Sequence, residues 1–80
     1  MKRSPNKEGQ KAFGMRLREL RKSKGLTQET LSYMADIELS TLNRIELGKA
    51  GTSLANIFAL CEALEIQPKQ LFDFELPTRK

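Results

Sequence analysis

A chain of 80 residues holds one small domain, which excludes a second hydrophobic core and argues against a large enclosed substrate pocket. Its 14 Lys and Arg residues outnumber its 10 Asp and Glu residues, and the resulting formal charge of +4 favours a polyanion such as nucleic acid as the partner. Charge alone fits a basic surface kept for solubility equally well. One cysteine and no histidine exclude an internal disulfide and argue against a metal site for zinc.

The sequence contains no sign of a membrane segment or an export signal. No run of apolar residues approaches the roughly 20 that span a bilayer, and the basic N-terminus lacks the apolar stretch of a secretory signal. No phosphate-binding loop is present, and we expect no cofactor. These features predict a cytoplasmic protein.

The first predicted helix follows a polar N-terminal segment. Residues 1–10 contain proline and glycine and predict a flexible basic arm. A helical period begins near Lys11, with apolar residues at i, i+4 and i+7, namely Phe13, Leu17 and Leu20. Gly25 follows the basic last turn and is typical of a helix end.

Two short helices joined by a tight turn come next. Thr27 is a good cap for a helix over residues 28–35, whose inner face is predicted to be Leu31, Met34 and Ala35. Asp36 follows, and aspartate tolerates a turn or left-handed conformation better than most residues. A third helix is already under way within three residues and runs to about Gly48.

The last two predicted helices complete an all-α domain. Ser53 is predicted to cap a fourth helix over residues 54–66, with a core-facing set of Leu54, Ile57, Phe58, Cys61 and Leu64. Pro68 begins a short fifth helix over residues 68–74, and residues 75–80 are predicted to be a frayed basic tail. The expected domain, residues 11–74, is therefore a compact bundle of five helices without a sheet.

The third helix has two different sides. At about 100° per residue, Leu42 and Ile45 define its buried side. The opposite side gathers Ser40, Asn43, Arg44 and Leu47, with Leu39 at its margin. Such a stripe fits a solvated surface, and it also fits contact with base edges, where an arginine can bind guanine O6 and N7 or reach a phosphate.

The run "LTQETLSYMADIELSTLNRIELGK" resembles the helix-turn-helix of the lambda-repressor/Cro class, the XRE family. The "TQ" that opens the second helix, the "RIE" followed by glycine that ends the third, and "ALEIQPKQLF" carry the resemblance, which extends from about Phe13 to Phe72. It implies a lambda-repressor-like domain in which the second helix crosses the DNA backbone and the third enters the major groove.

The resemblance also suggests roles for single residues. It implies base contacts from the third helix, by Leu39, Ser40, Asn43 and Arg44. Gln28 corresponds to a glutamine that touches a phosphate in the family, and further backbone contacts are predicted for Thr27, Thr41 and Lys49. Each of these backbone residues alone also suits a solvent-facing role, as do Arg16, Arg18, Lys22 and Lys24.

The family pattern pairs Glu46 with the arginine at position 21, and a seam carboxylate needs such a fixed partner. We therefore predict a structural salt bridge between Arg21 and Glu46. Two residues depart from the pattern: Asp36 replaces the usual glycine of the turn, and Glu38 replaces the usual Ser or Thr cap. The fold tolerates both departures, which bear on how Leu39 and Ser40 meet the bases.

These observations favour a sequence-specific DNA-binding regulator, in the form of a homodimeric repressor on a palindromic operator with half-sites about 34 Å apart. Phe74 is the predicted dimer contact, whereas Leu71 and Phe72 suit the core of the monomer at least as well. The alternative is an antitoxin that binds a toxin protein as well as DNA. An enzyme is disfavoured, because Ser32, Ser40 and Cys61 have no evident base to activate them.

Overall fold

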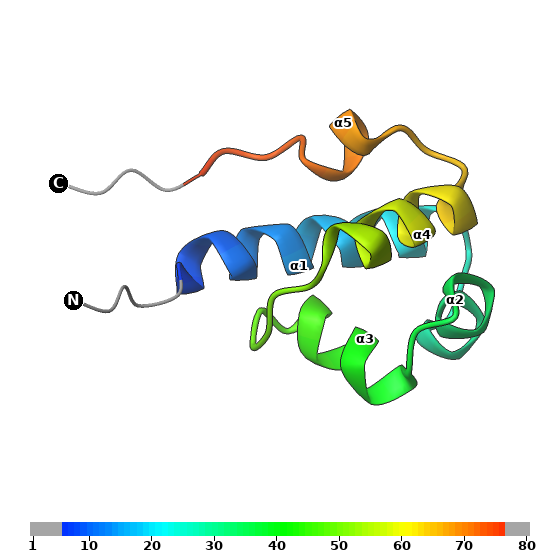
Figure 1. Ribbon diagram of the computed structural model, residues 1–80. Coiled ribbons are helices and arrows are strands. Elements are labelled where there is room, and N and C mark those ends of the chain that lie inside the picture. Colours follow the sequence, from blue (N-terminus) through cyan, green and yellow to red (C-terminus); the bar gives the residue numbers. More distant parts are fainter. Residues whose placement is uncertain (1–5, 77–80) are drawn as a thin grey trace, which may run out of the picture.

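The computed structural model describes residues 6–76, and within this range the chain forms five helices and no strand (Figure 1). The predicted all-α class is confirmed. No helix among these residues has the length and apolar character needed to cross a membrane. The helices are α1 (Lys7–Ser23), α2 (Gln28–Ala35), α3 (Leu39–Glu46), α4 (Leu54–Leu64) and α5 (Pro68–Leu71).

Helix α1 is the longest element and carries neighbours on two sides. It packs against α3 on one side and against α5 on the other, while α2 packs against α3 and α4 (Figure 1). Their inner faces meet in one core, and burying each of its large side chains contributes about 1.5–3 kcal/mol. The fully buried residues are Leu17, Leu31, Leu42, Ile45, Leu60, Leu64 and Leu71.

Helix α1 begins at Lys7, four residues before the predicted start at Lys11. The side chain of Asn6 accepts a hydrogen bond from the backbone N–H of Gly9 at 2.8 Å, so it satisfies one of the free donors of the first turn. The predicted arm over residues 1–10 is therefore wrong from residue 7 onward. Residues 1–5 of that arm and 77–80 of the predicted tail lie outside the described range.

Three apolar residues assigned to inner faces are exposed instead. Met34 on α2 is largely accessible, and Leu54 and Phe58 on α4 are 69% and 54% exposed. The core side of α4 contains the predicted Ile57, Cys61 and Leu64, and it also contains Leu60, which was not predicted to face inward. The fourth helix stops at Leu64, and the fifth at Leu71, both earlier than predicted.

Cys61 is a buried core residue, as predicted. Burial raises the pKa of its thiol above the usual value, because the apolar surroundings disfavour the charged thiolate. The reactive form of the sulfur is therefore scarce at neutral pH, and the residue serves as a small apolar filler.

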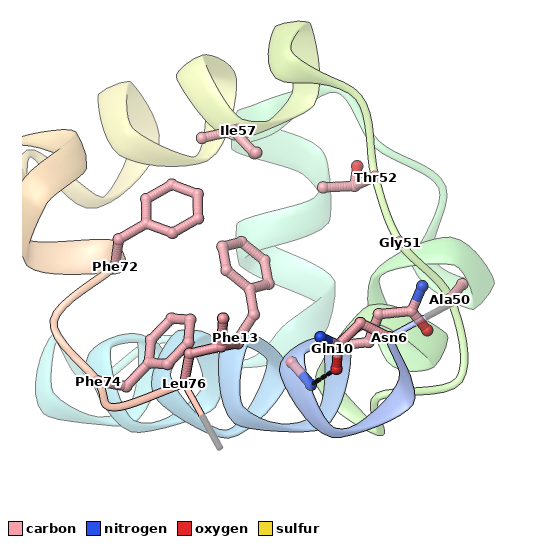
Figure 2. Close-up of a pocket in the computed structure, with 11 residues that line it drawn as sticks. Asn6, Gln10, Phe13, Ala50, Gly51, Thr52, Ile57, Phe72, Phe74 and Leu76 are labelled. Carbon is pink, nitrogen blue, oxygen red and sulfur yellow. Dashed lines mark hydrogen bonds between the residues drawn. The ribbon is translucent and has the colours of Figure 1, made fainter. Parts of the chain in front are cut away.

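An aromatic cluster of Phe13, Phe72 and Phe74 joins the chain after α5 to α1 (Figure 2). The ring centroids of Phe13 and Phe74 are 6.5 Å apart in an edge-to-face arrangement. The rings line an open cavity of about 540 Å³ between the first turns of α1, the loop before α4 and Leu76. Phe74, predicted at a dimer interface, thus packs within its own chain because the last segment folds back over α1.

Candidate nucleic-acid interface

The contact between α1 and α3 is close enough to involve the backbone. A Cβ atom placed on Gly14 of α1 would lie 2.6 Å from the carbonyl oxygen of Glu46, and one on Gly48 would lie 2.6 Å from the Cα atom of Lys11. Two glycines therefore allow the end of α3 to rest directly on α1. Gly48 also has a φ of 75°, which suits glycine, so its role in ending the helix is consistent with the sequence prediction.

The predicted pair of Arg21 and Glu46 is present and buried. Arg21 Nε donates to Glu46 Oε2 at 2.7 Å, and Arg21 Nη2 donates to Glu46 Oε1 at 3.0 Å. The two side chains are only 9% and 2% exposed. Arg21 Nη1 also donates to the backbone carbonyl of Leu26 at 2.8 Å, so the guanidinium fixes the loop before α2 as well.

Two amide side chains extend this pair toward the surface. Gln28 Nε2 donates to Glu46 Oε1 at 2.9 Å, and Asn43 Nδ2 donates to Gln28 Oε1 at 3.3 Å. We call the four residues Arg21, Glu46, Gln28 and Asn43 the polar relay. The relay connects α1, α2 and α3, and it runs from a buried ion pair to an exposed side chain of α3.

The side of α3 that faces away from the core is open. Leu42 and Ile45 are fully buried, as the helical spacing predicted. The outer flank of α3, which we define as Leu39, Ser40, Asn43 and Arg44, is exposed throughout. Leu47 at the end of the helix is exposed too, and Thr41 is half-buried. No part of the described chain covers the outer flank.

The turn between α2 and α3 contains the two residues that depart from the family pattern. Asp36 adopts the left-handed conformation, with φ 55° and ψ 47°, at the position where glycine is more usual. Glu38 occupies the cap position of α3 and makes no side-chain cap hydrogen bond, so the first turn of α3 keeps free N–H groups. The departures leave the tight turn intact.

Two of the residues predicted to contact the DNA backbone, Thr27 and Gln28, lie at the start of α2. Thr27 is its cap: its hydroxyl oxygen accepts from the Thr30 N–H at 3.0 Å, and the hydroxyl donates to Thr30 Oγ1 at 2.9 Å. A shallow cleft of about 310 Å³ opens beside Gln28, with the exposed Arg18 among its lining residues. Lys49 is exposed just after α3. A helix N-terminus with basic neighbours suits a phosphate.

Arg16, one of the basic residues considered for phosphate contact, is engaged elsewhere. Its Nε donates to the backbone carbonyl of Gln70 at 2.9 Å, and its guanidinium pairs with Glu19 and lies 3.9 Å from Asp73. These contacts tie α1 to α5. The residue therefore supports the fold on the side away from α2.

A tight turn sets the short helix α3, with its exposed polar flank, against α2, and α1 holds α3 from its buried side. This is the arrangement of a helix-turn-helix DNA-binding domain. The helix-turn-helix family model matches residues 17–71, which is more than half of the chain. The chain therefore belongs to this family, of the XRE type, and is a DNA-binding transcription regulator.

Named relatives agree with this assignment. The chain is 40% identical over 63 residues to control protein C.BamHI of Bacillus amyloliquefaciens, with 78% of each sequence covered. Among solved structures, it is similar to the restriction-modification controller protein C.AhdI from Aeromonas hydrophila, with 46% identity, a TM-score of 0.77, and 79% of this chain and 96% of that one covered. The clp gene regulator ClgR from C. glutamicum matches with 25% identity and a TM-score of 0.76, over 80% and 83% of the two chains.

Proposed function

We propose that the protein is a sequence-specific regulator that binds a palindromic operator as a homodimer, with α3 in the major groove of each half-site. The observation that carries the proposal is the open outer flank of α3 on a rigidly held helix. Acting on DNA, the protein works in the cytoplasm at the bacterial nucleoid. Because two relatives are named as control proteins, one of them of a restriction-modification system, we further propose that it controls genes of that kind.

The outer flank of α3 supplies the base contacts in this proposal. Arg44 has the reach and the planar donor pair to bind guanine O6 and N7. Leu39 and Ser40 lie one turn earlier on the same flank, where a methyl group or a short hydroxyl can meet a base edge. Asn43 belongs both to this flank and to the polar relay.

Phosphate contacts fix the register of the helix and carry no sequence information themselves. We assign them to Gln28, Thr41 and Lys49, with Arg18 on the rim of the cleft beside α2. Thr27 contributes through its backbone rather than its hydroxyl, because the hydroxyl already bonds Thr30. Lys22 and Lys24 are exposed near the end of α1 and add longer-range attraction.

The outer face of α4, which we define as Leu54 and Phe58, is the surface we propose for the dimer. The two residues are one helical turn apart and largely exposed, and the exposed ring of Phe72 adds further apolar surface after α5. A second copy that presents the same face would bury all of these groups in a self-complementary contact. This assignment replaces Phe74, which is half-buried where its ring packs on Phe13, whereas Phe72 also packs on Phe13 but remains 47% exposed.

Selection of binding sites from random duplexes tests the whole proposal. We expect one inverted repeat to be enriched, with half-site centres about 34 Å or one helical turn apart. Affinity should fall steeply with salt, with a log–log slope of about −0.9 for each phosphate neutralised. Retention of all sequences alike, or a flat salt response, would contradict sequence-specific regulation.

The antitoxin alternative rests on the same exposed face of α4, which a toxin could occupy in place of a second copy. The relatives reported above are named as regulators, which favours the regulator. Purification of the protein from its native host distinguishes the two. A stoichiometric second protein that competes with self-association would favour the antitoxin.

A further inference from the structure

The hydrogen bonds of the polar relay have a direction that its chemistry dictates. The buried carboxylate of Glu46 can only accept hydrogen bonds, so the side-chain atom of Gln28 that faces it must be the NH₂ group. The carbonyl oxygen of Gln28 then points the other way, toward Asn43. An oxygen can only accept there, so Asn43 must turn its own NH₂ group toward Gln28.

These hydrogen bonds decide which side-chain atoms Asn43 presents to a ligand. One proton of Nδ2 is used by Gln28, which leaves Oδ1 and the second Nδ2 proton on an exposed side chain of the outer flank. A phosphate carries no donor, so a fixed outward acceptor is a poor partner for it. Guanine shows only the acceptors N7 and O6 in the major groove, whereas adenine shows the N6 amine beside the acceptor N7.

We propose that Glu46, acting through Gln28, orients Asn43 to select adenine at one position of each half-site. In this arrangement Asn43 Oδ1 accepts from adenine N6 and Nδ2 donates to adenine N7. Glu46 and Gln28 are positioning residues, and Asn43 is the residue that touches the base. The inference rests on the proposed function, because it requires α3 to enter the major groove.

The role of the buried ion pair is thereby extended from holding α3 to setting its specificity. Without the relay, the amide of Asn43 can rotate and offer its NH₂ group to guanine or to a phosphate instead. Arg21 contributes by holding the carboxylate of Glu46 in place through two hydrogen bonds. The sequence preference of an exposed side chain is thus set by a carboxylate that is almost inaccessible to solvent.

The experiment compares binding-site preferences for four forms of the full chain: wild type, Asn43→Ala, Gln28→Ala and the control Gln10→Ala. Gln10 lies on α1, lines the cavity next to Ala50 and Gly51, and belongs to neither the outer flank of α3 nor the polar relay. Each form is selected on random duplexes, and its affinity for single-base variants of the best site is measured. The position at which Asn43→Ala loses preference is then filled with adenine, purine without the 6-amino group, or 7-deazaadenine.

We expect wild type to prefer adenine at that position by about fivefold or more, and to lose the preference with either base analogue. Gln28→Ala should bind more weakly to all sites through its lost phosphate contact, and should in addition lose the adenine preference there. The preference at the position read by Arg44 should remain in the same variant. Gln10→Ala should leave all preferences unchanged.

A Gln28→Ala protein that keeps the adenine preference while binding more weakly overturns the role of the relay. A folded Asn43→Ala protein with unchanged base preferences overturns base reading by Asn43, and thermal unfolding checks that this variant is folded. If wild type selects a sequence without an adenine that depends on Asn43, this inference alone fails. If wild type selects no sequence at all, the proposed function fails with it.

Discussion

Two regions of the molecule differ in how completely their side chains are buried or paired within the chain. Where α1 meets α3, backbone touches backbone at Gly14, and the carboxylate and guanidinium of Glu46 and Arg21 are paired and buried. On the outer face of α4, Leu54 and Phe58 are apolar and largely exposed. In the first region, contacts within a single chain are enough to hold α3 in place. The second leaves apolar surface for which the described chain supplies no cover.

The strongest test of the first region is to break the ion pair. Arg21→Met leaves the carboxylate of Glu46 buried without its cation, and should lower the free energy of unfolding by about 3–5 kcal/mol. Chemical denaturation measures this change. The double variant Arg21→Met with Glu46→Leu removes both charges and should recover much of the loss. A single variant as stable as wild type would show that the pair does not hold α3.

Gly14→Ala tests the close approach of the two backbones. The added methyl group meets carbonyl oxygens of α3, so α1 and α3 must separate, which should cost about 1–3 kcal/mol of unfolding free energy. Gly51→Ala is the matched control, because its Cβ would meet only the end of the Gln10 side chain, at 3.3 Å. Equal stability losses in the two variants would contradict a special role for position 14.

Arg44→Ala should separate recognition from folding. The residue is exposed, so the unfolding free energy should be nearly unchanged, while discrimination between the operator and random DNA should fall by about 1–3 kcal/mol. Fluorescence anisotropy at fixed salt measures both affinities. Arg18→Ala is a useful comparison, because a phosphate contact weakens binding to all sequences alike. Unchanged discrimination would remove Arg44 from base reading.

Phe58→Ala should act on association and spare the monomer. More than half of the side chain is exposed, so the loss of monomer stability should be small, while dimerisation should weaken by about tenfold, or about 1.4 kcal/mol. Sedimentation equilibrium measures the monomer–dimer constant. Lys22→Ala, an exposed charged position on α1 and outside this face, should leave it unchanged. Unaltered self-association in Phe58→Ala would move the dimer surface elsewhere.

The sequence predicted the helices, the turn at Asp36 and the two sides of α3, because each depends on residues close together in the chain. It wrongly placed Leu54 and Phe58 on the inner face of α4 and missed Leu60 there, since helical spacing admits all of these residues and only the packing of α2 and α5 against α4 chooses among them. The contact at Gly14 depends on how two distant helices cross. The start at Asn6 was missed because no apolar period marks that turn.

Within the candidate site, the pairing of Arg21 with Glu46 came from the family pattern and from the cost of an unpaired seam carboxylate. The rest of the polar relay could not be predicted in the same way. Gln28 and Asn43 are 15 residues apart, and a hydrogen bond between two amides follows from the angle between α2 and α3 rather than from spacing. Only the structure gives that angle.

Side chains of α1 reach two other helices: Arg21 pairs with Glu46 of α3, and Arg16 donates a hydrogen bond to the backbone carbonyl near the end of α5. Helix α4 packs on α2 and α5, so among residues 6–76 the packing of the helices sets the separation between the outer flank of α3 and the outer face of α4. In a dimer built on α4, the two α3 helices keep one spacing and one relative angle. An operator lengthened by a single base pair turns one half-site by roughly 35° around the duplex, and both α3 helices could follow it only if the packing between helices changed.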